Sequence, residues 1–309
     1  MKSRLVLPHS TASAFSVTAS LAIIYFVWAS TYVGTAFVVE EIDPYTGSGF
    51  RFILAGLLLF LFIIITKGPK ALLVTKKQVR NAMFIGFILI GLSSPLLGVA
   101  AQQISSGLIA LLVAMTPIFI AILRFIFGDI PSIKTILGIV IGFTGVIVVL
   151  VIPTVSNNLF IIICLISNVV WAIGSFWSQK IELPKSPLTT AAIQTLFGGM
   201  CAVLIGALRG ERTSSFFSAS ESETWIAFIY ISVMGAIAYS AYAFLLVNTP
   251  ISLVATHAFV NPVVAIFLGN LLRNEKISLS IILSGTIVVV GIALVVLGEK
   301  KKELINPET

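Results

Sequence analysis

The stretch AFVNPVVAIFLGNLL, residues 258–272, is apolar enough for a buried helix, yet Pro262 lies near its centre. A proline inside a helix removes one backbone hydrogen bond and clashes with the preceding turn. A similar stretch, MTPIFIAIL, occupies residues 115–123 and places Pro117 145 positions before Pro262. Each proline follows a polar residue, Thr116 or Asn261. Two such prolines in matched surroundings indicate a duplicated chain.

Other landmarks repeat in the same order along the chain, and their offsets drift only from 143 to 146 positions. A drift of this size is what single-residue insertions in loops would give. The sequence therefore predicts two homologous units, at residues 16–152 and 158–298. The matched pairs are Trp28 and Trp171, Pro44 and Pro187, Gly91 and Gly235, Asp129 and Glu275, and Gly145 and Gly291.

The composition is that of an integral membrane protein. Of 309 residues, 58% are hydrophobic and 10% are charged, with a mean hydropathy of +1.10, whereas soluble domains are about 45 to 50% apolar. A spanning helix needs about 20 apolar residues, and stretches of that length recur with short polar breaks. We expect an all-α protein with ten transmembrane helices, at residues 16–39, 45–66, 81–101, 105–127, 132–152, 158–179, 187–208, 224–247, 251–272 and 278–298.

Five spans per unit would make the two units inverted copies and would place both termini on one side of the membrane. If the tails, 1–15 and 299–309, are cytoplasmic, the inner segments hold 14 Lys and Arg residues and the outer segments hold 4. The remaining one, Arg51, lies inside the second span. Because cytoplasmic loops are rich in Lys and Arg, we predict cytoplasmic tails and a location in the cytoplasmic membrane. The net charge of +7 then needs no nucleic-acid partner.

Inverted repeats are typical of secondary transporters, whose substrate site lies near the midplane between the repeats and is lined by weakened helices. Pro117 and Pro262 would lie on such helices and would leave backbone carbonyl groups free. Substrate, water, Thr116 or Asn261 could then bind those groups. The alternative is that membrane helices simply tolerate proline.

Several stretches together resemble the EamA family of the drug/metabolite transporter superfamily. They are VWASTYVG at residues 27–34, DPYTGSGFRFILAGLLL at 43–59, the two proline segments and the Gly-rich fifth and tenth spans. The resemblance implies a ten-helix exporter or exchanger of amino acids, nucleotide-like metabolites or drugs, with a central cavity between the halves. It brings no signature of a particular substrate.

Arg51 is the charged residue that lies well inside a predicted span. A buried charge without a partner has a high cost in free energy. One interpretation is that its side chain extends to the outer surface and pairs with Glu40, Glu41 or Asp43. The other is that it faces the cavity and attracts a carboxylate of the substrate.

His257 and Asn261 share one face of the ninth span because they lie four residues apart. They could face the cavity, or they could form an interhelical hydrogen bond worth on the order of 0.6 kcal/mol. No Asp or Glu occupies the middle of a span, so His257, with an ordinary pKa of about 6.5, is the candidate for proton coupling. We favour a facilitator or exchanger that is driven by the substrate gradient.

Aromatic and hydroxyl side chains complete the predicted substrate site. Trp28 and Trp171 are mates in the two units, and Thr31 follows Trp28 within one turn. Tyr239 and Tyr242 could line the cavity or serve in ordinary packing. No metal, cofactor or catalytic group is predicted, and Cys164 and Cys201 are expected to be small core residues. GIVIG, residues 138–142, is typical of close helix packing within one chain or in a homodimer.

Two other classes of function are weaker. An intramembrane enzyme would need a His-Glu-x-x-His zinc motif or paired intramembrane aspartates, and the sequence has neither. A receptor or membrane scaffold should carry a large loop or tail, but the longest loop, 209–223, has 15 residues. The sequence therefore favours a transporter of a small solute, amino acid-like or drug-like, in the export direction.

Overall fold

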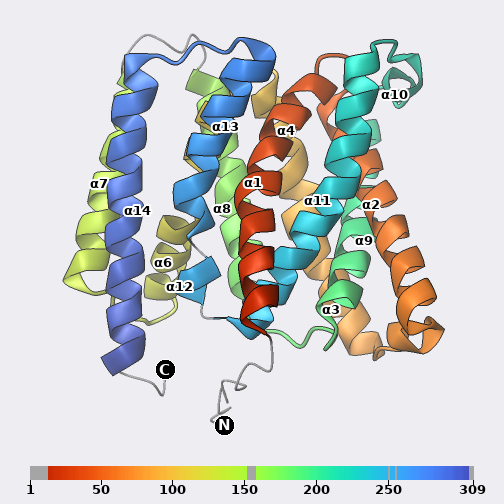
Figure 1. Cartoon of the computed structure of the whole chain (residues 1–309), viewed down its shortest axis with the longest axis horizontal. Coiled ribbons are helices and arrows are strands. Elements are labelled where there is room, and N and C mark those ends of the chain that lie inside the picture. The colour runs from red at the N-terminus through yellow and green to blue at the C-terminus, as the bar shows by residue number, and fades with distance from the viewer. Residues whose placement is uncertain (1–12, 152–157, 250, 255, 306–309) are drawn as a thin grey trace.

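The computed structural model describes residues 13–151, 158–249, 251–254 and 256–305. The described residues form a bundle of helices that lie side by side and run between the two ends of the molecule (Figure 1). In chain order they are α1 (Ala14–Val38), α2 (Pro44–Lys67), η1 (Pro69–Leu72), α3 (Lys76–Gly86), η2 (Phe87–Ser93), α4 (Ser94–Ala101), α5 (Ser106–Val113), α6 (Thr116–Ile126), α7 (Ile133–Val151), α8 (Asn158–Ser178), α9 (Pro187–Leu208), α10 (Ser214–Ser218), α11 (Ser222–Asn248), α12 (Ile251–Val254), α13 (His257–Arg273) and α14 (Leu279–Ile305).

Eight helical segments in the described part of the chain are long and apolar enough to span a membrane. Two shorter apolar helices, Ile133–Val148 and His257–Arg273, fall on the fifth and ninth predicted spans. Large apolar side chains point outward along single faces, such as Leu57, Leu61 and Ile65 on α2, which are 53 to 73% exposed. Exposed apolar faces of this extent are what hydrocarbon covers.

Local sequence signals explain where the helices begin and end. Pro44 and Pro187, predicted mates, both lie in the first turn of a helix, where the missing N–H has no helical partner to lose. Gly68, with φ of 74°, ends α2, and Asn274, with φ of 52°, ends α13. The side chains of Ser13, Thr75, Ser105 and Ser186 accept hydrogen bonds from backbone N–H groups in the first turns of α1, α3, α5 and α9.

Three predicted spans are not single α-helices. The third includes the π-helical segment η2 between α3 and α4. The fourth divides at residues 114–115 into α5 and α6, directly before Thr116 and Pro117. The ninth divides into α12 and α13, but the division precedes His257 and α13 continues through Pro262. The tenth span continues as helix to Ile305, beyond the predicted end at 298.

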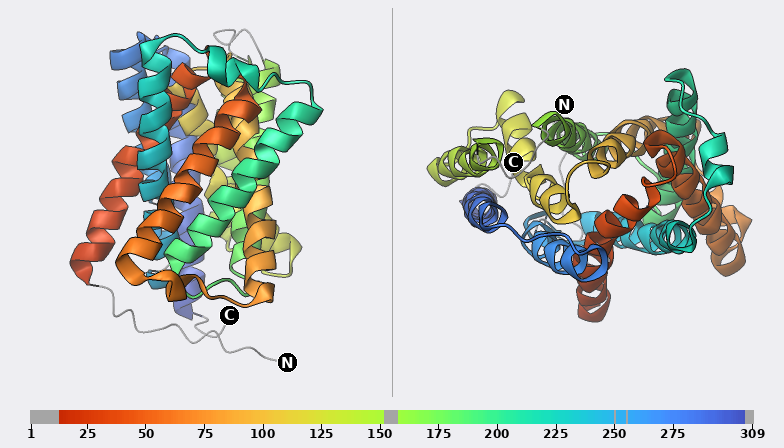
Figure 2. Two further views of the ribbon diagram at one scale, coloured as in Figure 1. Left: turned by 90° about the vertical axis from the view of Figure 1, so that its right-hand side faces the viewer. Right: turned by 90° about the horizontal axis from the view of Figure 1, so that it is seen from above.

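Helices from the two predicted units pack on each other in pairs. The most extensive pairs are α2 with α9, α7 with α14, and α1 with α11, and α13 packs on both α1 and α5. Viewed along the helices, α7 and α14 form one edge of the bundle (Figure 2). A Cβ atom on Gly56 of α2 would lie 2.7 Å from the backbone nitrogen of Leu196 on α9. A Cβ atom on Gly138 would lie 2.5 Å from the Gly291 carbonyl oxygen, so GIVIG packs α7 against α14 within one chain.

The first described turn of α1 and the last turns of α14 lie at the same end of the bundle (Figure 1). We call this the terminal end, and the end that carries α10 the opposite end. At the opposite end, Arg273 pairs with Glu40 at 2.8 Å and with Glu275 at 3.4 Å. Glu275 also accepts hydrogen bonds from the backbone N–H of Ser106 at 3.0 and 3.1 Å and from its hydroxyl at 2.8 Å. These contacts join α1, α5 and α13.

Candidate functional site

Four of the predicted site residues form one aromatic cluster, although they come from four helices. Trp28 of α1 stacks on His257 of α13 with ring centroids 5.6 Å apart and planes 2° from parallel. Its edge contacts are with Tyr242 of α11 at 5.0 Å and Trp171 of α8 at 5.7 Å. Edge-to-face and offset pairs at such distances are favourable aromatic contacts. The two predicted tryptophan mates therefore meet inside the bundle.

Tyr239 extends this cluster toward α9. Its ring lies 6.4 Å from that of Trp171, and its hydroxyl donates a hydrogen bond to Gln194 Oε1 at 2.6 Å. Both side chains are buried, at 5% and 4% exposure. Gln194 was not predicted, although an amide within an apolar span is a usable signal because it must find a partner.

His257 and Asn261 have different hydrogen-bond partners, on α12 for His257 and on α1 and α13 for Asn261. His257 Nδ1 lies 2.7 Å from the Val254 carbonyl oxygen, so Nδ1 carries a proton, and Nε2 is an acceptor when the ring is neutral. The Asn261 amide is best satisfied with its nitrogen donating to the carbonyl oxygens of Ile24 and Tyr25 at 3.1 Å and of His257 at 3.2 Å. Asn261 thus makes the interhelical hydrogen bond that the sequence allowed.

Arg51 does not pair with the acidic residues at the helix ends. Its Nη1 donates to Thr35 Oγ1 on α1 at 3.1 Å, and its guanidinium carbon lies 4.3 Å from the centroid of the Phe52 ring. The Nε atom is buried without a hydrogen-bond partner. Among the described residues, no ion pair with a carboxylate compensates this charge.

The three carboxylates considered for Arg51 are occupied elsewhere. Glu40 pairs with Arg273, and Asp43 accepts from the backbone N–H of Arg212 at 3.1 Å. Glu41 accepts from the N–H groups of Ser220 and Glu221, and the hydrogen bond from Ser220 is the main reason that its pKa lies below the ordinary value. Arg51 is therefore left with hydroxyl and aromatic neighbours.

A ladder of polar side chains on α1 connects Arg51 to the aromatic cluster. Thr35 donates to the carbonyl of Thr31 at 2.8 Å, and Thr31 donates to the carbonyl of Trp28 at 2.6 Å. Tyr32, on the same turn, interacts with both Arg51 and Asn261. At 1.5 Å per residue, Trp28 and Thr35 are about 10 Å apart along the helix. Tyr32 and Thr35 were missed because hydroxyl groups are common in apolar spans and only proximity distinguishes these two.

Thr116 and Pro117 lie at the break between α5 and α6. A side chain of α8 forms hydrogen bonds with groups that the break leaves without helical partners. Thr116 Oγ1 bonds to the Val113 carbonyl at 2.7 Å and to Asn168 Oδ1 at 2.6 Å. Asn168 Nδ2 donates to the Leu112 carbonyl at 2.8 Å. Thr116 thus binds a free backbone carbonyl group, as the sequence allowed. Asn168, which was not predicted, binds a second one. Thr116 is not part of the aromatic cluster, but Asn168 lies one turn before Trp171 on α8.

The chain belongs to the EamA-like transporter family, whose sequence model matches it twice, at residues 17–151 and 158–297. The uncharacterized inner membrane transporter YedA of Escherichia coli K12 is 32% identical over 279 residues, which are 89% of each chain. The uncharacterized transporter YvbV of Bacillus subtilis is 22% identical over 89% of this chain and 90% of its own. The chain is thus a multi-pass membrane protein of a transporter family.

More distant matches also cover most of this chain. The WAT1-related protein At3g02690, chloroplastic, of Arabidopsis thaliana is 24% identical over 88% of this chain and 67% of its own. One crystal structure superposes with a TM-score of 0.65 at 15% identity and covers 94% of this chain and 99% of the other. At that identity the likeness establishes a shared fold alone.

Proposed function

We propose that the protein is a secondary transporter that exports a small amino acid-like or drug-like solute across the cytoplasmic membrane. Ten spans would form two inverted five-helix units, with both termini cytoplasmic and the terminal end of the bundle facing inward. The substrate site would lie between the units and open alternately to the two sides.

The helix pairs support this relation between the units. The pairs α2–α9, α5–α13 and α7–α14 each join a helix to its own predicted mate in the other unit. The pair α1–α11 has its counterpart in the contacts of α8 with η2 and α4. A twofold axis between inverted units would produce both kinds of pair. The two separate matches to the family lie on the same halves of the chain.

The uncompensated guanidinium of Arg51 is the observation that carries the proposed substrate site. A buried charge favours an opposite charge that replaces its lost hydration, and guanidinium groups bind carboxylates with two parallel hydrogen bonds. A substrate carboxylate beside Thr35 would supply that partner. An apolar or aromatic body, extending about 10 Å along α1, would then reach Trp28, Trp171, Tyr242 and His257.

The remaining predicted residues would act around this core of the site. Thr31 would support the backbone of α1 at Trp28, Asn261 would fix the position of α1 against α13, and Tyr239 would close the side toward α9. The breaks near Thr116 and Pro117, and before the helix that holds Pro262, would supply the weakened segments at which the units move.

A flux assay in proteoliposomes tests the proposal. We expect one or more amino acids or aromatic carboxylates, from a panel that includes nucleosides and cationic drugs, to exchange across the membrane. Arg51→Gln should weaken exchange of the carboxylate substrate at least tenfold, whereas Arg124→Gln, at the rim of the bundle, should not. Transport of neutral solutes alone, equal in the parent and in Arg51→Gln, would contradict the assignment of Arg51.

A further inference from the structure

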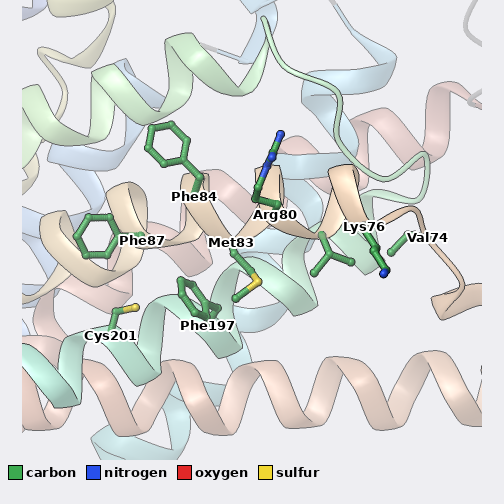
Figure 3. A pocket seen from close by; sticks show the side chains of 9 residues that line it. Val74, Lys76, Arg80, Met83, Phe84, Phe87, Phe197 and Cys201 are labelled. Carbon is green, nitrogen blue, oxygen red and sulfur yellow. The ribbon is translucent and has the colours of Figure 1, made fainter.

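A lateral groove runs along the outside of the bundle, apart from the proposed substrate site. It has a volume of about 750 Å³ and lies between α3 with η2 on one side and α9 on the other (Figure 3). Its walls are the apolar side chains of two facing ridges. Val79, Met83 and Phe87 follow each other at four-residue spacing on one side, and Phe197 and Cys201 do so on the other.

The groove changes from basic to apolar along α3. Lys76 and Arg80 line it where α3 begins, and Phe84 continues the same ridge one turn further in. Figure 3 shows Lys76 and Arg80 toward the start of the helix and the aromatic side chains beyond them. Because α3 begins at the terminal end of the bundle, the charged part would lie at the membrane surface and the apolar part at the depth of the hydrocarbon.

The surrounding segment strengthens the positive charge. Lys67, Lys70, Lys76, Lys77 and Arg80 lie within 14 consecutive residues, and no Asp or Glu occurs between Asp43 and Asp129.

One carboxylate approaches this segment from another loop, and it binds the face of α3 next to the groove. Glu182 pairs with Lys77 at 2.9 Å and accepts from Gln78 at 3.2 Å, while Asn81 donates to its backbone carbonyl at 2.9 Å. The hydrogen bond from Lys77 lowers the pKa of Glu182, so this carboxylate is ionised and engaged. In the described part of the chain, Lys76 and Arg80 form no ion pair of their own.

We propose that this groove binds one anionic phospholipid, with the phosphate at Lys76 and Arg80 and an acyl chain along Met83, Phe87 and Phe197. Basic pockets between membrane helices favour anionic headgroups, and arginine suits phosphate because its fork of N–H donors matches the oxygens. A soluble anion would use the charged end alone and leave the apolar walls to other molecules. A phospholipid fits both ends. Since α3 and α9 belong to different units, the lipid would bridge them.

Native mass spectrometry of the full chain in an uncharged detergent tests the proposal. Phosphatidylglycerol and phosphatidylcholine with the same acyl chains are titrated separately. We expect phosphatidylglycerol to bind about 25-fold more tightly, since two basic side chains at an anionic surface contribute about a fivefold factor each. Lys76→Gln combined with Arg80→Gln should abolish the preference. Lys67→Gln combined with Lys70→Gln removes the same charge from the same segment and should retain most of the preference, because neither side chain lines the groove.

Equal binding of the two lipids by the parent would overturn the proposal, as would an equal loss of preference in both double variants. If the first double variant cannot be purified, the single variants Lys76→Gln and Arg80→Gln should each lose about fivefold. A thermal-shift series separates the lipid from a free anion. Phosphatidylglycerol should raise the melting temperature of the parent and glycerol phosphate should not, whereas equal shifts would assign the site to a soluble anion.

Discussion

Glu275 stabilises the opposite end of the bundle by holding the start of α5, and removing its charge should lower stability measurably. Its carboxylate accepts from the N–H and the hydroxyl of Ser106, a residue with 0% exposure. It also pairs with Arg273 at 3.4 Å, and its own side chain is 16% exposed. An N–H in the first turn of a helix has no partner within the helix, so Glu275 satisfies a donor that would otherwise be buried unpaired.

The magnitude follows from these two donors. Hydrogen bonds to a charged group are worth about 1.5–3 kcal/mol and neutral ones about 0.5–1.5 kcal/mol, so Glu275→Gln should lose roughly 1 kcal/mol for each donor. The interaction of a negative charge with the helix dipole adds about 0.5 kcal/mol. The sum is close to 2.5 kcal/mol. At about 2 °C per kcal/mol for a long chain, the melting temperature should fall by about 5 °C.

Thermal unfolding in detergent, followed by tryptophan fluorescence or by size-exclusion chromatography after heating, measures this shift. Glu182→Gln is the matched control, because its ion pair with Lys77 is exposed at 48% and 63% and such pairs contribute about 0–1 kcal/mol. Glu275→Ala should be worse than Glu275→Gln, since it leaves both Ser106 donors without an acceptor. Equal shifts for Glu275→Gln and Glu182→Gln would refute the assigned role of Glu275.

Three further predictions concern topology, coupling and packing. In a variant without the native cysteines, an impermeant thiol reagent added to intact cells should label Gln103→Cys but not Lys70→Cys, and the reverse pattern would invert the proposed orientation. Uptake into liposomes should be unaffected by an imposed pH gradient in the parent and in His257→Gln, whereas pH-driven uptake that the substitution abolishes would make His257 a coupling residue. Gly56→Ala should cost about 1–3 kcal/mol because α2 and α9 must separate, while Gly285→Ala, whose Cβ would lie 3.6 Å from its nearest neighbour, should be close to neutral in melting experiments.

The positions of the helices followed from hydropathy, because each span must cover the same thickness of hydrocarbon. The predicted span 187–208 coincides with α9, and 158–179 differs from α8 by one residue. The departures arise where tertiary contacts determine the backbone. In η2, Ser93 donates to the Ser167 carbonyl of α8 at 2.8 Å, and no pattern within residues 87–93 specifies that partner.

The candidate site was predictable to the extent that its members are rare residue types. Tryptophan, histidine and arginine stand out within apolar spans, and the repeat itself indicated that Trp28 and Trp171 are related. Their mutual contact could not be deduced, because the pairing of helices depends on the three-dimensional relation of the two units. The same holds for Thr35, whose role comes from its position beside Arg51.

The two prolines that reveal the duplication have different structural consequences. Before Pro117 the chain leaves the helix, and Thr116 and Asn168 bind the carbonyls of Val113 and Leu112. Pro262 lies within a continuous helix, where Asn261 bonds to α1 instead.

Equivalent residues of the two units therefore hold different backbone conformations in one structure. Under the alternating-access mechanism that we propose, such a difference would open one side while the other is closed, and an exchange of the two conformations would reverse the opening. The polar residue before each proline matters for this reason. In this structure it bonds to a nearby backbone carbonyl in each unit, that of Val113 for Thr116 and those of Ile24 and Tyr25 on α1 for Asn261.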